Sequence, residues 1–174
     1  MQAAAAKQGP DFTAFASTTG GSLRGTAYAM CRDWHLAQDL TQVTLTKLYL
    51  GWARASQADN VEAYARTTLV RTYLDHRRRR SSAERTGALS SAEAMPAAPP
   101  HIDNPDLRLT VLGALAQLPA ADRAVLVLRY WEDCSVERVA ELLGIPVNTV
   151  KTRTRRSLIR LRAQLSSERA ALYS

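Results

Sequence analysis

Residues 135–162 constrain the fold of this chain more tightly than any other stretch. Ser135 can cap a helix that runs to Leu143, and Gly144 suits the left-handed residue that ends one. Apolar residues recur within this helix at helical spacing, at Val136, Val139, Ala140 and Leu143. Pro146 then stands at the start of a second helix, Val147–Leu165. The pattern predicts two helices joined by a tight turn, a helix-turn-helix.

The second of these helices has one apolar face and one basic face. Successive residues advance by about 100° around a helix, which places on the inner face Val150, Thr154, Ser157, Leu158 and Leu161. The opposite side carries Asn148, Thr152 and Arg155, flanked by Lys151 and Arg156. Residues 142–167 hold six Lys and Arg and no acid. Basic and amide side chains donate to phosphates and base edges, so the pattern favours a DNA-reading helix over a merely solvated basic one.

The charge of the whole chain points the same way. Its 174 residues include 23 Lys and Arg and 16 Asp and Glu, which gives a net charge of +7 and indicates an anionic partner. The sequence has no carboxylate pair, Ser/His/Asp set or phosphate-binding glycine loop, and neither Cys31 nor Cys134 belongs to a metal-ligand pattern. We therefore expect no catalytic residues, no cofactor and no metal.

No segment of the chain is suited to entering or crossing a membrane. No apolar run approaches the ~20 residues of a membrane-spanning helix. The N-terminal sequence MQAAAAKQGPDF does not contain the core of a signal peptide. We expect a cytoplasmic protein with no membrane contact.

A change of composition at residues 81–104 divides the chain. This stretch is rich in Ser, Ala and Pro and shows no sustained periodicity, which is typical of a flexible linker. We predict an all-α fold with two small helical domains, residues 1–80 and 105–174, on either side of the linker.

The first domain has helical patterns in three places. We predict helices at about Ser22–Cys31, Leu36–Trp52 and Val61–Arg79, with a polar loop at Ala53–Asn60. The predicted apolar face of the middle helix holds Leu36, Leu40, Val43, Leu48, Leu50 and Trp52. Its polar strip holds Asp39, Gln42 and Thr46.

The last helix of the first domain ends in four consecutive arginines, Arg77–Arg80. A basic run at a helix C-terminus can simply complement the helix dipole. Together with Arg66 and Arg71, however, this run exceeds what a dipole requires, and we predict a stripe that contacts phosphates.

The second domain contains four predicted helices: about Pro105–Gln117, Ala120–Trp131, Ser135–Leu143 and Val147–Leu165. We expect the small core that supports the helix-turn-helix to consist of Leu107, Val111, Leu115, Leu126, Val127, Tyr130 and Trp131. Trp52 in the first domain and Trp131 in the second are interpreted as core residues rather than as platforms for stacked bases.

Both domains resemble parts of one protein family. The second is similar to region 4 of bacterial sigma factors at Leu118-Pro119-x3-Arg123, Leu126-x-Leu128-Arg129-Tyr130-Trp131, Val139-Ala140-x2-Leu143-Gly144 and Thr149-Val150-Lys151-Thr152-Arg153. The first resembles region 2.2 at Ala37-Gln38-Asp39-Leu40-x-Gln42 followed by Trp52, and regions 2.3 and 2.4 at Tyr64–Arg80. Over nearly its whole length the chain resembles the extracytoplasmic-function type of the sigma-70 family.

The resemblance implies where each partner binds. Docking on core RNA polymerase, at the clamp coiled coil of its largest subunit, is implied for Asp39, Leu40, Gln42 and Thr46. Contacts with the −10 element of promoter DNA are implied for Asn60, Tyr64, Arg66, Thr67, Arg71, Arg77, Arg78 and Arg79. Contacts with the −35 element are implied for Asn148, Thr149, Lys151, Thr152, Arg153, Arg155 and Arg156. The beta flap of the polymerase is a further expected contact, and an anti-sigma factor is a candidate partner.

Three positions depart from the family pattern. Gln38 and Val43 stand where family members usually and often, respectively, carry an acid, which implies a less electrostatic contact with polymerase. Arg71 stands where many members have Asn, which implies a different preference for a −10 base. The resemblance also implies that the loop Ala53–Asn60 holds one flipped base.

These observations predict an initiation factor that directs core polymerase to promoters. The alternative is a self-sufficient helix-turn-helix repressor or activator whose N-terminal helices dimerise. Such a regulator would bind duplex DNA without polymerase, at two half-sites.

Overall fold

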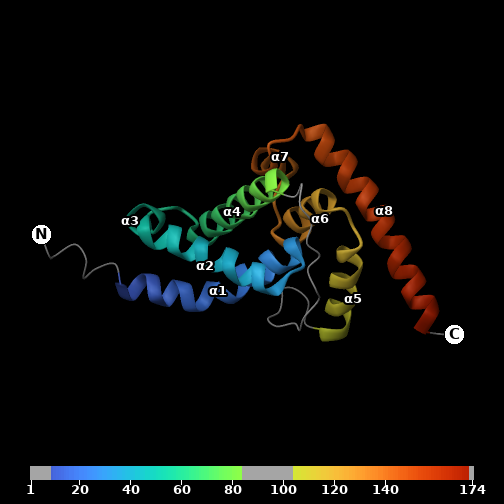
Figure 1. Ribbon diagram of the computed structural model, residues 1–174, viewed down its shortest axis with the longest axis horizontal. Helices are drawn as coiled ribbons and strands as arrows, with labels where there is room; N and C mark the ends of the chain where they lie inside the picture. Colours follow the sequence, from blue (N-terminus) through green and yellow to red (C-terminus); the bar gives the residue numbers. More distant parts are fainter. Residues whose placement is uncertain (1–8, 84–103, 173–174) are drawn as a thin grey trace, which may run out of the picture. The chain divides into compact units, whose positions relative to one another are not determined.

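A computed structural model describes residues 9–83 and 104–172, and all the regular structure within these ranges is helical, as predicted (Figure 1). The elements form two compact units. The first comprises α1 (Gly9–Cys31), α2 (Trp34–Leu50), α3 (Trp52–Ala55) and α4 (Val61–Ala83). The second comprises α5 (Pro105–Ala116), α6 (Ala120–Leu126), the π-helical turn η1 (Val127–Trp131), α7 (Val136–Leu143) and α8 (Val147–Leu172). α4 continues to Ala83, inside the predicted linker, and residues 84–103 of that linker lie outside the described ranges.

In the first unit α1, α2 and α4 pack against one another. Their shared core is apolar and holds Leu23, Met30, Leu48, Leu69 and Val70, all of them nearly inaccessible to solvent. Two polar contacts join the helices across this core. The Tyr73 hydroxyl donates to the Met30 carbonyl at 3.3 Å, and Lys47 Nζ donates to Thr72 Oγ1 at 3.0 Å. α4 is therefore tied to both α1 and α2.

The first helix begins earlier than predicted. The predicted start was Ser22, but α1 runs without interruption from Gly9 and passes through Gly20 and Gly21. Glycine inside a helix costs about 1 kcal/mol relative to alanine. The aromatic contacts of the early turns offset that cost, since Phe12 and Phe15 pack on Trp52 with ring centroids 5.2 and 5.1 Å apart.

The predicted middle helix is divided in two near its end. α2 stops at Leu50, Gly51 forms the joint, and the short helix α3 follows over residues that were predicted as the start of a loop. Trp52 is only 6% exposed, which confirms its assignment to the core. Since Trp52 contacts α1, the joint lets the chain leave α2 while keeping this indole in the aromatic cluster.

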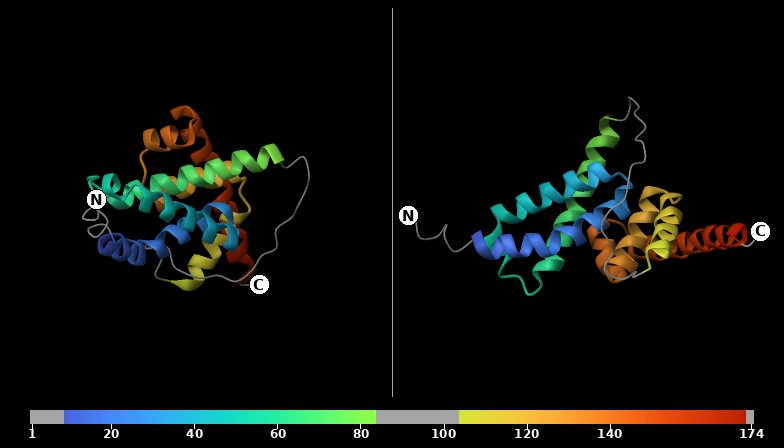
Figure 2. Two further views of the ribbon diagram at one scale, coloured as in Figure 1. Left: turned by 60° about the vertical axis from the view of Figure 1, so that its left-hand side comes forward. Right: turned by 90° about the horizontal axis from the view of Figure 1, so that it is seen from below.

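In the second unit α5, α6 and α7 all pack against α8 (Figure 2). The buried Arg123 closes the end of α5, because its Nη1 donates to the carbonyls of Leu115, Ala116 and Leu118. Of the predicted core residues, Leu115, Leu126 and Val127 are buried. Leu107 and Tyr130 were predicted wrongly, since they are 53% and 58% exposed.

The helix-turn-helix is confirmed in its local detail. The Ser135 hydroxyl accepts from the Arg138 amide at the start of α7, and Gly144 ends that helix with φ 64° and ψ 38°. Val150 and Ser157 of α8 are fully buried, as predicted, whereas Leu158 is 39% exposed and was wrongly assigned to the inner face. Leu158 lies 100° around α8 from Ser157, at the edge of the apolar stripe.

None of the helices in the described ranges is long and apolar enough to cross a membrane.

Candidate functional site

The outer face of α2 carries the polar residues predicted to dock on polymerase. Asp39, Gln42 and Thr46 are exposed, whereas Leu40 is 3% exposed and belongs to the core. Val43 and Leu50 were predicted to be buried, and they are 45% and 80% exposed. Positions 39, 43, 46 and 50 follow helical spacing and therefore share one face. The exposed surface of α2 is thus a mixture of polar and apolar side chains.

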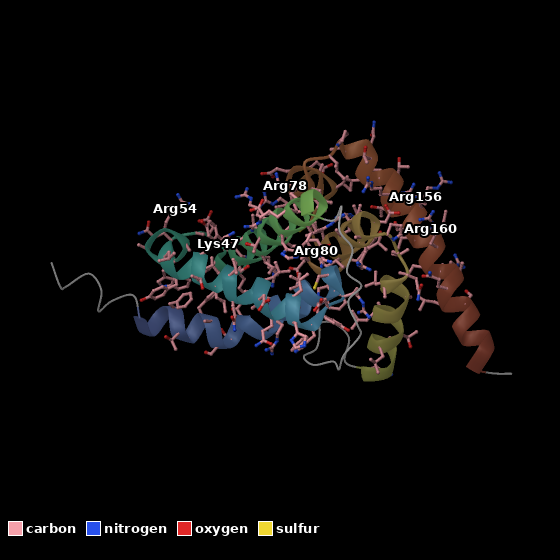
Figure 3. All side chains as sticks on the ribbon, viewed as in Figure 1. Lys47, Arg54, Arg78, Arg80, Arg156 and Arg160 are labelled. Atoms are coloured by element: carbon pink, nitrogen blue, oxygen red, sulfur yellow. The ribbon has the colours of Figure 1, made fainter. Side chains whose placement is uncertain are left out.

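The N-terminus of α4 meets α3 at a polar contact. Asn60 caps α4, its Oδ1 accepting from the Ala63 amide at 2.8 Å. The Tyr64 hydroxyl lies 3.3 Å from Arg54 Nη2 of α3, and this hydrogen bond raises the pKa of Arg54 above its ordinary value. Arg54 was missed from the sequence because it fell in the predicted loop. It adds a permanent positive charge beside Tyr64, and Figure 3 labels it on α3.

Further along α4, several of the predicted arginines interact with neighbours on their own helix. Arg66 forms an ion pair with Glu62 at 3.2 Å, and Arg78 forms one with Asp75 at 2.8 Å. Arg79 donates to the Asp75 carbonyl, and the Arg77 guanidinium lies 5.9 Å from the centre of the Tyr73 ring. Thr67 donates to the Ala63 carbonyl, and Arg71 is exposed. The basic run is present, with local acids beside part of it.

The residues predicted to reach the −35 element lie in the first turns of α8. Asn148, Lys151, Thr152 and Arg155 are exposed, while Thr149 and Arg153 are half-buried. The Thr152 hydroxyl donates to the Asn148 carbonyl at 2.9 Å. The exposed residues share the face opposite Val150 and Ser157, so the structure brings these donors together on one side of the helix.

Within the part of the chain that the structure describes, Arg156 forms a hydrogen-bonded ion pair with another helix. Its Nη2 lies 3.0 and 2.9 Å from the two carboxylate oxygens of Asp122 in α6. Arg160, one turn further along α8, lies 3.6 Å from the same carboxylate. No sequence pattern indicated Asp122, since the two residues are 34 positions apart and their contact depends on how α6 packs on α8.

The first turn of α7 carries a second perturbed group. The Glu137 carboxylate accepts from its own backbone amide and from the Ser135 hydroxyl, and these bonds lower the pKa of Glu137. This carboxylate therefore adds its negative charge where the helix dipole favours one.

Two family models match the chain, and each falls within one unit. Sigma-70 region 2 matches residues 15–83, which span α1 to α4. Sigma-70 region 4 matches residues 108–161, which span α5 to the first half of α8.

Known relatives and solved structures agree with these matches. The chain is 32% identical to an RNA polymerase sigma-E factor of Streptomyces avermitilis, over 90% of this chain and 86% of that protein. It is 31% identical to the protein of the same name from Streptomyces coelicolor, over 89% and 86% of the two. The sigma factor RpoE of Bartonella quintana, solved with the anti-sigma factor NepR, shares 25% identity with a TM-score of 0.68 over 90% of this chain and 97% of that one. The chain therefore belongs to the sigma-70 family of RNA polymerase sigma factors, in its extracytoplasmic-function group.

Proposed function

We propose that the two units of this sigma factor divide promoter recognition between them. The second unit reads the −35 duplex with the exposed face of α8, and the first docks on core polymerase with α2 and contacts the −10 element with α3 and α4. The observation that carries the proposal is the face of α8, where Asn148, Lys151, Thr152 and Arg155 are exposed together on a helix-turn-helix. Long basic and amide side chains on such a face match the donors that duplex DNA accepts.

The docking proposal rests on the exposed face of α2. Val43 and Leu50 expose apolar surface beside Asp39, Gln42 and Thr46. Apolar surface stabilises an interface when it is buried, and polar groups around it set orientation. We therefore expect contact with the polymerase clamp coiled coil to depend on both kinds of residue, with Leu40 acting from within by holding α2 in place.

The −10 proposal rests on the start of α4 and the loop before it. Asn60, Tyr64 and the newly identified Arg54 present a cap, a phenol and a cation on one surface. Aromatic rings and guanidiniums are the groups on which unpaired bases stack. The arginines towards the end of α4 would then contact phosphates of the adjoining duplex.

The mechanism that we propose is non-covalent, and it uses no catalytic residue of this chain. Phosphate contacts supply affinity, and a few base contacts supply sequence specificity. Because its partners are core polymerase and promoter DNA, we propose that it acts in the cytoplasm. The complex of the Bartonella relative with NepR supports an anti-sigma factor as a further partner, which would compete for these same faces.

The decisive experiment is run-off transcription with purified core polymerase on genomic DNA, with mapping of the start sites. Shared −35 and −10 sequences upstream of the starts are the expected result. A self-sufficient regulator would instead bind its duplex tightly without core polymerase, at two half-sites. Tight, specific duplex binding by the chain alone contradicts the proposal.

A variant separates docking from folding. Asp39→Arg reverses one exposed charge on α2 and should cost no more than about 0.5 kcal/mol of stability. We expect it to lose in competition with the wild-type chain for core polymerase. Equal competition by a folded Asp39→Arg protein removes this face of α2 from the interface.

A further inference from the structure

A shallow hollow on the second unit is lined by side chains of α8. It encloses about 350 Å³ and is lined by Thr152, Arg155, Arg156, Ile159 and Arg160. Three of these five residues are arginines and none is acidic. The hollow lies along one flank of the face that carries Asn148 and Thr152. Its surface is mainly apolar, so the positive charge of this flank lies on the exposed arginine side chains around it rather than in the hollow itself.

Two of these arginines contact the same buried carboxylate, that of Asp122. Arg156 Nη2 contacts both oxygens of Asp122, at 3.0 and 2.9 Å, and Arg160 Nη1 lies 3.6 Å from Oδ2. The Asp122 side chain is 2% exposed, whereas the side chains of Arg156 and Arg160 are 52% and 49% exposed. Figure 3 marks both arginines on α8. The Asp122 carboxylate is thus inside the unit, whereas the side chains of Arg156 and Arg160 that it contacts face solvent.

Asp122 itself is fixed by its helix. It lies in the first turn of α6, where its amide donates to the Pro119 carbonyl and where the helix dipole favours a negative side chain. A buried carboxylate without a cation would be strongly unfavourable. Asp122 therefore stays in place within α6 and keeps the two arginines close to it.

Each guanidinium keeps donors for a second acceptor. A guanidinium carries five N–H groups, and Arg156 uses one nitrogen for both contacts with Asp122. Its Nε and Nη1 have no partner among the residues that the structure describes. A guanidinium set in place by a carboxylate on one edge can bind a phosphate with the other, and it then loses little side-chain entropy on binding.

We propose that Asp122 is a positioning residue that presets Arg156 and Arg160 to bind one backbone phosphate of the duplex, beside the −35 element. Arg156 thus contributes affinity and register, and base reading falls to its exposed neighbours on α8. This inference rests on the proposed function, because it requires α8 to lie against the −35 duplex.

The direction in which Asp122→Asn changes the affinity for DNA distinguishes a positioning role from a purely electrostatic one. Asp122→Asn removes a negative charge close to DNA, so electrostatics without positioning predicts tighter binding of holoenzyme to a promoter duplex. The proposal predicts weaker binding, by about two- to tenfold, since two long side chains must then be ordered on association. Glu141→Gln is the matched control, because it removes an exposed acid of the same unit and should not weaken binding.

The phosphate can be located directly. A neutral methylphosphonate is placed in turn at each phosphate flanking the −35 element, and holoenzyme affinity is measured for wild type and for Asp122→Asn. We expect one position at which the neutral linkage weakens wild-type binding but has little further effect on Asp122→Asn. The ranking of single-base −35 variants should be the same for both proteins, because a phosphate contact carries no base information.

A second variant covers the case in which Asp122→Asn unfolds. Arg156→Lys keeps the positive charge and can still pair with Asp122, but it has no second edge to offer a phosphate. It should weaken binding and reduce sensitivity at the same methylphosphonate position, where Arg160 still contributes. Tighter or unchanged binding by folded Asp122→Asn, or full methylphosphonate sensitivity in Arg156→Lys, overturns the proposal.

Failure of the inference is distinct from failure of the proposed function. A wild-type holoenzyme that ignores every −35 base change contradicts −35 recognition by α8. A holoenzyme that responds to those changes, while Asp122→Asn binds as wild type, contradicts the positioning role alone.

Discussion

The two arginine-rich helices of this protein, α4 and α8, hold their positive charges in different ways. On α4 the acids lie three or four residues from the arginines with which they pair, Glu62 with Arg66 and Asp75 with Arg78, and the four side chains are between 34% and 77% exposed. On α8 the acid is Asp122, which belongs to another helix and is buried. The first arrangement is local, and the second exists only when the unit is folded.

The difference bears on how each helix meets DNA. Exposed pairs one turn apart stabilise a helix by a few tenths of a kcal/mol, so an arginine of α4 can leave its acid for a phosphate at little cost. A carboxylate removed from water holds its cation much more firmly. We infer that α4 offers adaptable charges to a region of DNA that changes shape, whereas α8 offers fixed ones to a duplex.

The largest expected effect is on folding and comes from the tertiary pair. Arg156→Ala leaves the buried Asp122 with only the more distant Arg160, and it should lower the free energy of unfolding by about 1–3 kcal/mol. Thermal or urea unfolding of the purified chain measures this. A loss no greater than that of an exposed arginine would show that Asp122 tolerates isolation, and the contrast between the helices would disappear.

Arg155→Ala should affect DNA binding and leave folding nearly unchanged. Arg155 is exposed on the outer face of α8, and a bidentate base contact is worth about 1–3 kcal/mol. Affinities of holoenzyme for a set of single-base −35 duplexes should show a relaxed preference at one position. If the ranking of the duplexes matches wild type, Arg155 supplies charge and no readout.

Arg78→Ala tests the local side of the comparison. Its pair with Asp75 is exposed, so we expect a change in unfolding free energy within about 0.5 kcal/mol. The salt dependence of holoenzyme binding should fall by about one phosphate contact if Arg78 meets DNA. A large loss of stability would show that this pair is structural, like the one on α8.

The smallest effect concerns pH and the first turn of α7. Hydrogen bonds from its own amide and from Ser135 depress the pKa of Glu137, so its stabilising contribution is present above the ordinary pKa of a glutamate and is lost as the pH falls through the folded-state value. Glu137→Gln should therefore be slightly less stable than wild type near neutral pH. The two proteins should converge in acid, which unfolding curves across that range can measure.

The parts of the fold that depend on neighbouring residues were predictable from the sequence. Ser135 and Gly144 bound α7 as expected, because a cap and a left-handed stop act within a few residues. The family resemblance also identified the expected partners, whereas composition alone indicated only that a partner is anionic.

The errors arose where packing between helices decided the outcome. The helix predicted from Ser22 begins instead at Gly9, and its first turns make aromatic contacts through Phe12 and Phe15. Val43, Leu50 and Leu158 are apolar residues that are 45%, 80% and 39% exposed, although hydrophobicity alone had placed them inside. Asp122 was not predicted for the same reason, because its pairing with Arg156 depends on how the helices pack and not on their spacing in the sequence.

The long first helix has a mechanical consequence. Near its start Phe12 packs on Trp52, close to the loop that precedes α4, and near its end the Met30 carbonyl accepts from Tyr73, one turn before Arg77. Its 23 residues form a strut about 34 Å long that braces both ends of the surface proposed to meet the −10 element. The spacing between the base-holding end and the phosphate-holding end is therefore nearly constant. We therefore expect the DNA, rather than this surface, to change shape when the two strands separate, with the protein as the rigid template against which the open form is stabilised.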